Sequence, residues 1–429
     1  MSHANHPLMP RGYALRKIDS DLDVLLNSYK IVEIEGVLGC GKSWTALNHA
    51  QSATTLSDTE FVLPIIQTNT HLALIGAAPH LVDDWSSIPD LYESMYREAG
   101  RTGSYIAVSS YVEDSQDIYA QKYASRGIKI RMRPCTLAEL GHSSGQVPWS
   151  DLVQGRFIPG ASSLDLGQTA DFICAGGWPA GMGLNEEGGR RAAEHCVEDA
   201  LLQAASICKK KVPTASAVLT AIADGAGSDS GYPALAKLVE NLNTKAPSRT
   251  TMSTYIGILD KLCLIEKIPG WNAPIRSNSR VRTKPRLFPV DCSVGTVMRQ
   301  FAGPDLLQDA PMLHSCLKSM ALHELICRVD SPVSATPGRV CYYSDADGLD
   351  IDFIALFEDG SWAPINVELG ERHVPSSAKR IARLYRKLSA NPHCELKPPA
   401  FSAIILGAST RRWKEDIAGA SVFPINDLS

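Results

Sequence analysis

The chain has 429 residues, of which 44% are apolar, and it carries 42 basic and 46 acidic side chains. This length predicts two to three globular domains. With a formal net charge of −4, a nucleic-acid role would need a local basic patch, because the chain as a whole is not basic. Eleven cysteines without a Cys-x-x-Cys pair indicate free thiols in a reducing compartment rather than a disulfide framework or a zinc ribbon. Because no stretch approaches the ~20 apolar residues of a membrane span, we expect a cytoplasmic protein without a membrane partner.

The first motif of the chain is the octapeptide GVLGCGKS at residues 36–43. It matches G-x-x-x-x-G-K-[ST], in which glycines let backbone N–H groups turn toward phosphate oxygens. The motif requires a strand before it and a helix after it, and the flanking segments YKIVEIEG and KSWTALNHAQSA have these patterns. A glycine-rich turn without a ligand is the alternative, and the flanking segments favour a phosphate-binding loop, or P-loop.

Each position of this P-loop has an expected role in binding ATP. We expect Lys42 to lie along the β- and γ-phosphates as a point charge and Ser43 to bind Mg²⁺. The helix that begins near Gly41 would direct its positive end at the same anion. The predicted nucleotide-binding residues are Gly36, Val37, Leu38, Gly39, Cys40, Gly41, Lys42, Ser43 and Trp44.

Further along, the segment HLVDDW ends an apolar run at two adjacent acids, Asp83 and Asp84. We expect Asp83 to hold the magnesium ion and Asp84 to orient the attacking water, because a P-loop needs acidic partners on a neighbouring strand. Two acids in an ordinary loop are the alternative. The strands GSYIAVSSY and GIKIRMRP follow, and this repetition of strands and helices predicts a parallel sheet wrapped by helices.

The motifs EGVLGCGKSWTA, LVDDW, YIAVSS, KIRMRPCTLAEL and AGGWPA, in this order, resemble prokaryotic AAA-like P-loop ATPases. Members of that group carry a C-terminal domain of unknown function with a restriction-endonuclease-like core. The resemblance covers most of residues 13–370 and implies ATP binding and hydrolysis, a winged-helix middle and a nuclease-like end.

In ATPases of the AAA type, a polar residue at the end of the YIAVSS strand senses the γ-phosphate, so the resemblance implies a catalytic role for Ser110; a surface turn is the alternative. The group usually has Asp-Glu at 83–84 and Gly-Ser at 109–110, where this chain has Asp-Asp and Ser-Ser. Because Asp84 is shorter than Glu by one methylene, its carboxylate lies farther back, and we expect this to affect the efficiency of hydrolysis more than nucleotide binding.

The middle of the chain alternates helical patterns with turns such as ADGAGSDSGYP. A helix capped by Ser248, with Met252, Tyr255 and Leu259 on its apolar face, precedes a short strand, and this order is typical of a winged helix. A basic run follows at residues 276–286. Contact with DNA phosphates and a solvated or interdomain basic face are equally open explanations of this run.

The C-terminal part contains the strands VCYYSDADGLDIDFIALF and SWAPINVELG. Such a hairpin resembles the metal site of PD-(D/E)XK nucleases, with Asp352 as the first acid and Glu324 as a further one. In place of Glu-x-Lys, however, the second strand has Asn366 and Glu368, so no lysine steadies a hydroxide. We therefore expect no DNA cleavage, although weak ion binding by Asp352, Glu324 and Glu368 is left open.

These features predict an α/β protein with an ATPase domain at 1–205, a winged-helix-like domain at 206–290 and a nuclease-like domain at 291–429. The predicted function is that of an ATP-binding, Mg²⁺-dependent ATPase that acts as a nucleotide-driven switch. Alternatives are a nucleic-acid-binding or nuclease-related protein regulated by nucleotide, and an interaction protein in which nucleotide is structural. The oligomeric state is left open.

Overall fold

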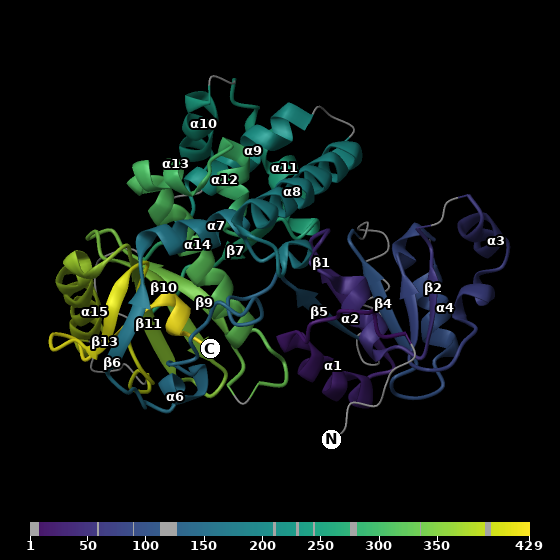
Figure 1. The fold of residues 1–429 in the computed structure, drawn as a ribbon, viewed down its shortest axis with the longest axis horizontal. Coiled ribbons are helices and arrows are strands. Elements are labelled where there is room, and N and C mark those ends of the chain that lie inside the picture. The colour runs from purple at the N-terminus through teal and green to yellow at the C-terminus, as the bar shows by residue number, and fades with distance from the viewer. Residues whose placement is uncertain are drawn as a thin grey trace. The chain divides into compact units, whose positions relative to one another are not determined.

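The structure is a computed structural model that describes residues 8–57, 60–88, 90–111, 127–208, 212–228, 231–242, 245–274, 281–334, 336–390 and 396–429. The chain forms two compact units. Unit 1 comprises residues 1–134 with 261–263, and unit 2 comprises residues 135–260 with 264–429. Figure 1 shows the fold of both units.

Unit 1 is built on a five-stranded sheet in the order β2-β3-β4-β1-β5, in which all neighbouring strands are parallel. The strands are β1 (Ile31–Gly36), β2 (Ser52–Thr55), β3 (His80–Asp83), β4 (Tyr105–Ser109) and β5 (Gly127–Met132). The helices are α1 (Lys17–Ser28), α2 (Lys42–His49), α3 (Val62–Thr68), η1 (Thr70–Leu74), η2 (Trp85–Ser87) and α4 (Leu91–Glu98).

Helices lie on the sheet of unit 1 (Figure 1), and the strands β1, β3 and β4 are buried along nearly all of their length. Ile31, Val82 and Ala107 point from three strands into one core, where they pack with Tyr92 and Met95 of α4. Alternate side chains of a strand point to the opposite face, and α1 and α2 both contact β1. This layering is that of a helix-covered parallel sheet.

The connections of the sheet change direction at the carboxyl end of β1. From β1 the chain continues to β2 at one edge of the sheet, whereas from the adjacent β4 it continues to β5 at the other edge. In open α/β sheets, the point where neighbouring strands lead in opposite directions leaves a crevice beyond their carboxyl ends. The predicted P-loop begins at this point, since Gly36 ends β1.

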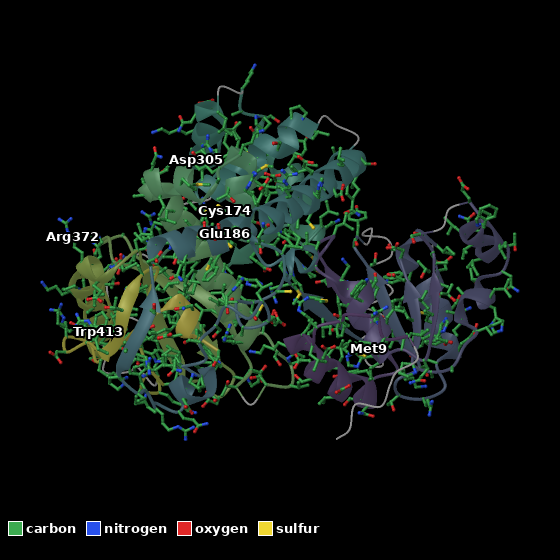
Figure 2. All side chains as sticks on the ribbon, viewed as in Figure 1. Met9, Cys174, Glu186, Asp305, Arg372 and Trp413 are labelled. Carbon is green, nitrogen blue, oxygen red and sulfur yellow. The ribbon has the colours of Figure 1, made fainter. Side chains whose placement is uncertain are left out.

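Unit 2 begins with a helical region, which the labelled Cys174 marks in Figure 2. Its helices are α6 (Trp149–Val153), α7 (Leu166–Ala175), η3 (Pro179–Gly181), α8 (Glu186–Cys208), α9 (Val212–Asp224), α10 (Tyr232–Asn241), α11 (Arg249–Lys261, with its last residue assigned to unit 1), α12 (Ser293–Arg299), α13 (Gly303–Gln308) and α14 (Ala310–Val329). After α11, the strands β7 (Ile265–Ile268) and β8 (Arg286–Pro289) form an antiparallel pair.

A second, mixed sheet of unit 2 has the order β6-β13-β14-β12-β11-β10-β9. Its strands are β6 (Gly160–Leu164), β9 (Gly338–Ser344), β10 (Asp350–Phe357), β11 (Trp362–Glu368), β12 (Ala403–Leu406), β13 (Ser409–Lys414) and β14 (Ser421–Pro424). The helices η4 (Glu371–His373), α15 (Val374–Ser389) and η5 (Ile425–Asp427) complete the unit. In Figure 2 the labelled Trp413 marks β13 of this sheet.

The predicted fold class is confirmed in its main features, namely a parallel α/β sheet with helices and a further sheet-containing part near the C-terminus. One element was predicted wrongly. The helix expected over 42–53 ends at His49, and Ser52–Thr55 forms the edge strand β2 because it pairs with β3. Here tertiary pairing overrides a helical pattern.

The three-domain division stays a prediction. Both of its internal boundaries, at 205/206 and 290/291, lie within unit 2. The segment 160–164, predicted to belong to the ATPase domain, pairs with β13 near the C-terminus. The order α9, α10, α11, β7, β8 is the one predicted for a winged helix. Ser248, which precedes α11, accepts a hydrogen bond from Thr251 N (3.2 Å), as predicted for a capping residue.

The cysteines lie mostly in the core. Seven of the nine whose side chains the structure describes are buried, as expected for thiols that serve as small core residues, and no disulfide joins any of the nine. Within the same part of the chain, no helix combines the length and apolar character that crossing a membrane requires.

Candidate functional site

The P-loop has a backbone conformation that depends on its glycines. Gly39 (φ 85°) and Gly41 (φ 101°) both lie in the left-handed region, which side chains with a Cβ rarely adopt. Gly36 has a different constraint, since a Cβ there would lie 2.3 Å from the carbonyl oxygen of Met132 on β5. Gly41 is also the N-cap residue of α2, so the loop leads directly into a helix N-terminus.

Lys42 is buried at the start of α2, and its ammonium folds back over the loop. Its Nζ donates to the carbonyl oxygens of Gly36 and Val37, at 2.9 Å each. These contacts hold a positive charge at the mouth of the P-loop, where the sequence predicted a phosphate contact. Because only 6% of Lys42 is exposed, its charge is weakly screened by solvent.

Ser43 and Asp83 meet beside this ammonium. The hydroxyl of Ser43, in the first turn of α2, hydrogen-bonds with the carboxylate of Asp83 at the end of β3. Burial raises the pKa of Asp83, and the neighbouring Asp84 raises it further, while the bond with Ser43 and the charge of Lys42 act in the opposite direction. The predicted metal-binding pair is therefore brought together.

Asp84 follows β3 in a left-handed conformation (φ 57°, ψ 37°), as the N-cap residue of η2. Asp and Asn are among the few side chains that tolerate this region. Burial raises the pKa of the Asp84 carboxyl, and the charge of Lys42 partly offsets that rise. The predicted catalytic acid thus lies within electrostatic reach of the P-loop lysine.

The end of β4 contacts η2 through Ser109. Ser109 is buried, and its Oγ lies 2.6 Å from Oγ of Ser86. Ser86 belongs to η2 and lies two residues after Asp84. The hydroxyl of Ser109 also contacts the carbonyl oxygen of Tyr111 (2.8 Å). Ser110 lies one residue beyond the strand and is partly exposed, and its catalytic role stays a prediction.

The remaining predicted loop residues differ in exposure. Val37 and Cys40 are fully buried, Leu38 is partly exposed, and Trp44 on α2 is half-exposed. The Cys40 thiol lies 3.6 Å from the carbonyl oxygen of Met132, so this side chain anchors the loop to β5. Val37 and Cys40 therefore offer backbone groups, not side chains, to any ligand.

The residues present fit a magnesium ion that is shared with a nucleotide. Mg²⁺ prefers oxygen ligands and usually keeps several water and phosphate ligands beside one or two protein groups. The adjacent Ser43 hydroxyl and Asp83 carboxylate meet this requirement. Among the residues that the structure describes, no group of three or more His, Cys, Asp or Glu side chains could hold a metal ion by itself.

The basic stretch 276–286 contains one residue that is not available to DNA. Arg286 is buried, pairs with Asp350, and lies 4.0 Å above the ring of Tyr342. Arg282 and Lys284 are exposed, whereas residues 275–280 lie outside the described part of the chain. Arg286 therefore stabilises the fold of unit 2, and the DNA contact stays a prediction for the rest of the stretch.

Each of the three C-terminal acids named from the sequence has its own cationic partner. Lys318 on α14 lies 2.7 Å from Asp352, and Arg380 on α15 lies 2.6 Å from Glu368. Glu324 pairs with Arg328 one turn along α14 (2.6 Å) and accepts a bond from Leu137 N (2.7 Å).

Two of these acids lie on neighbouring strands. Val367 packs into the core that contains α14, so its neighbour Glu368 points to the other face, toward α15, where it pairs with Arg380. Asp352 pairs with Lys318 of α14, and the charge of Arg380 also lowers its pKa. Both carboxylates are therefore neutralised by basic side chains.

The Lys318–Asp352 pair leads to a stability prediction. Burial alone would raise the pKa of Asp352, but Lys318, Arg380 and the N–H of Val367 lower it below its ordinary value of 3.8. We expect Lys318→Met to destabilise unit 2 by about 3 kcal/mol at neutral pH, because it leaves a buried carboxylate without its partner. Urea unfolding followed by tryptophan fluorescence measures this loss.

The pH dependence of this loss provides a check. A carboxyl with a lowered pKa stabilises the fold above its unfolded pKa, and this contribution is lost as the pH falls through its folded pKa. In the variant, burial without Lys318 raises the pKa of this carboxyl, so it takes up a proton at a higher pH than in the parent. The difference between parent and Lys318→Met should therefore shrink steadily as the pH falls from neutral to below about 4. The matched control is Lys397→Met, whose exposed pair with Asp359 (3.3 Å) should contribute nothing measurable. A loss of the same size in both variants would contradict the prediction.

Two functional candidates in unit 1 were not predicted from the sequence. Arg16, just before α1, donates to the carbonyl oxygen of Cys40 in the P-loop (3.0 Å). Asp19 in the first turn of α1 accepts from His49 of α2 (2.8 Å) and from Tyr13 (2.9 Å). Among these contacts, only the bond from Arg16 N to Asp19 has a local signal in the sequence. This signal is Arg-x-x-Asp before an apolar helical pattern, the spacing of a capping box.

Comparisons with known proteins add little. A model for a domain of unknown function (DUF8612) matches residues 167–305, less than half of the chain, and no curated protein matches. The Walker-type ATPase PABY2304 of Pyrococcus abyssi shares 12% identity with a TM-score of 0.38, over 70% of this chain and 100% of that chain. The Aeropyrum pernix ORC2 protein, solved as ADPNP-ADP complexes, shares 12% with a TM-score of 0.32, over 69% and 97%. Cdc6p from Pyrobaculum aerophilum shares 13% with a TM-score of 0.22, over 69% and 97%. Likenesses at this level assign no function.

Proposed function

We propose that unit 1 binds ATP together with Mg²⁺ and hydrolyses it, and that the protein acts as a nucleotide-driven switch. The observation that carries the proposal is the conformation of the P-loop. Its ammonium, Lys42 Nζ, is held 2.9 Å from two loop carbonyl oxygens, and the serine that follows meets an acid at the end of β3.

The roles of the residues follow from their charges. The Lys42 ammonium and the N–H groups of the loop bind the β- and γ-phosphates, whose charge they neutralise. Ser43 and Asp83 hold the magnesium ion, which when bound offsets the charge that develops on the phosphoryl oxygens.

Asp84 orients the attacking water in this proposal. Its carboxylate lies beyond β3, next to Asp83, and the positive charge of Lys42 acts to lower its pKa. A carboxylate whose pKa burial has raised is a stronger proton acceptor than an exposed one, and general-base catalysis improves as the pKa approaches the working pH. Ser109 supports this arrangement through Ser86, which lies two residues after Asp84.

The test is a direct measurement of nucleotide binding and turnover by the purified protein, with and without duplex DNA. We expect saturable, Mg²⁺-dependent ATP binding and slow release of phosphate. Binding without any turnover would favour a structural nucleotide, whereas the absence of binding at millimolar ATP would contradict the proposal. A change in turnover on adding DNA, weakened by salt, would favour the nucleic-acid-binding alternative.

A nuclease activity of unit 2 is not expected. We predict that the protein leaves plasmid and linear DNA uncut in Mg²⁺ or Mn²⁺, with and without ATP. Asp352 is neutralised by Lys318 and Glu368 by Arg380, and Glu368 stands where the nuclease motif has its lysine, so no cation is left to steady a hydroxide. Cleavage by the parent protein that disappears in Asp352→Ala would overturn this prediction.

A further inference from the structure

Arg16 contacts the P-loop from the side of the N-terminal segment. Its guanidinium is nearly buried, with 8% of the residue exposed. Nη1 donates to the carbonyl oxygen of Cys40 (3.0 Å), and Nη2 donates to the carbonyl oxygen of Arg133, just beyond β5 (2.9 Å). One planar side chain therefore joins the loop to the end of a strand, which a guanidinium can do because its donors point in fixed, different directions.

The backbone of Arg16 is itself held in place by the helix that follows the loop. Arg16 N donates to Asp19 Oδ2 (2.6 Å), and the other carboxylate oxygen of Asp19 accepts from His49 Nε2 (2.8 Å) on α2. Tyr13 donates to Asp19 and also contacts the hydroxyl of Thr45 on α2 (2.9 Å). The segment before α1 is therefore fixed to α2.

The contact with Cys40 determines how the next peptide group is oriented. In a planar trans peptide the carbonyl and the N–H point in opposite directions. Since Arg16 holds the carbonyl of Cys40, the N–H of Gly41 must point away from Arg16. The Cys40 thiol, bonded to the carbonyl oxygen of Met132 (3.6 Å), fixes the same residue from a second direction.

We propose that Arg16 is a positioning residue for nucleotide binding, which holds the Cys40–Gly41 peptide so that the Gly41 N–H faces the phosphates before ATP arrives. This inference rests on the proposed function of unit 1. A loop that is already ordered loses less conformational freedom on binding, and the affinity is correspondingly higher. Arg16 acts through the loop and does not itself touch the nucleotide.

The experiment compares Arg16→Ala and Arg16→Lys with the matched control Arg11→Ala, which removes an exposed arginine of the same segment. Calorimetry with ATP and Mg²⁺ should show affinity about tenfold weaker for Arg16→Ala and unchanged within about twofold for Arg11→Ala. Arg16→Lys should recover part of the affinity, because an ammonium keeps the charge but cannot reach both carbonyls in the same geometry. Millimolar guanidinium ion should improve binding by Arg16→Ala and leave the parent unaffected.

Hydrogen exchange without nucleotide separates this inference from the proposed function. Amides of residues 36–44 should exchange faster in both Arg16 variants than in the parent, whereas those of β3 and β4 should not change. If the parent binds no ATP, the proposed function fails, and the exchange data alone then decide whether Arg16 orders the P-loop. ATP affinity within twofold of the parent in both variants, or unchanged exchange of residues 36–44, would overturn the inference. If Arg16→Ala does not fold, Arg16→Lys provides both measurements.

Discussion

Replacing Lys42 with alanine should reduce ATP affinity by about two orders of magnitude while leaving unit 1 folded. A bond between an ionised donor and its acceptor contributes about 1.5–3 kcal/mol, and each 1.4 kcal/mol is a factor of ten in affinity. Lys42 is buried, so water cannot replace its charge beside the phosphates. Calorimetric titration of ATP in Mg²⁺ measures the change.

The matched control for this variant is Lys30→Ala. Lys30 precedes β1 and likewise donates to a backbone carbonyl, that of Ala99 (2.7 Å), so its loss removes a similar bond at the other end of the same strand. Both variants should lose a little stability, because Lys42 also satisfies the carbonyls of Gly36 and Val37. Only Lys42→Ala should lose ATP binding. Affinity within about twofold of the parent in Lys42→Ala would show that the loop is not a phosphate site.

The P-loop and its acids could be predicted because their signal is local. A motif of eight residues demands a strand before it and a helix after it, and both are present as β1 and α2. Asp83 was assigned correctly to a strand end, since β3 ends there and the carboxylate meets Ser43. Carboxyl ends of parallel strands share one edge of the sheet, so residues at those ends can be brought together by topology alone.

The contacts of Arg16 could not be predicted, because they are tertiary. Its guanidinium bonds to residues 24 and 117 positions away in the chain, and no periodicity of the sequence reports such distances. The same limitation applies to β6, whose pairing with β13 joins segments from opposite ends of unit 2.

In unit 2 the sequence indicated the acids but not their basic partners. Asp352 pairs with Lys318 of α14, and Glu368 pairs with Arg380 of α15. These contacts join residues from separate elements, and neither the composition nor the apolar pattern of β10 and β11 reveals them. The missing lysine at position 368 was visible in the sequence, whereas the cations that neutralise the two acids were not.

Substituting the two acids of unit 1 should separate metal binding from turnover. We expect Asp84→Asn to bind ATP within about threefold of the parent and to lose at least about 99% of its hydrolysis, because a group that acts on the attacking water contributes mainly in the transition state. Asp83→Asn should instead require more Mg²⁺ for binding, since the carboxylate that holds the metal acts in the ground state as well. Phosphate release and ATP binding, each measured over a range of Mg²⁺ concentrations, distinguish the two effects.

The substitution Asp84→Asn should remove the charge without disturbing the left-handed backbone at this position. Asn tolerates φ near 57° as well as Asp does, so Asp84→Asn removes the charge without straining the start of η2. Asp90, before α4, has the same conformation (φ 65°) and is exposed, so Asp90→Asn makes the same chemical change on the same backbone geometry outside the P-loop. It should keep full turnover. Equal losses of hydrolysis in Asp84→Asn and Asp90→Asn, or unaltered hydrolysis in both, would contradict the proposed role of Asp84. An unchanged Mg²⁺ requirement in Asp83→Asn would contradict the metal-binding role of Asp83.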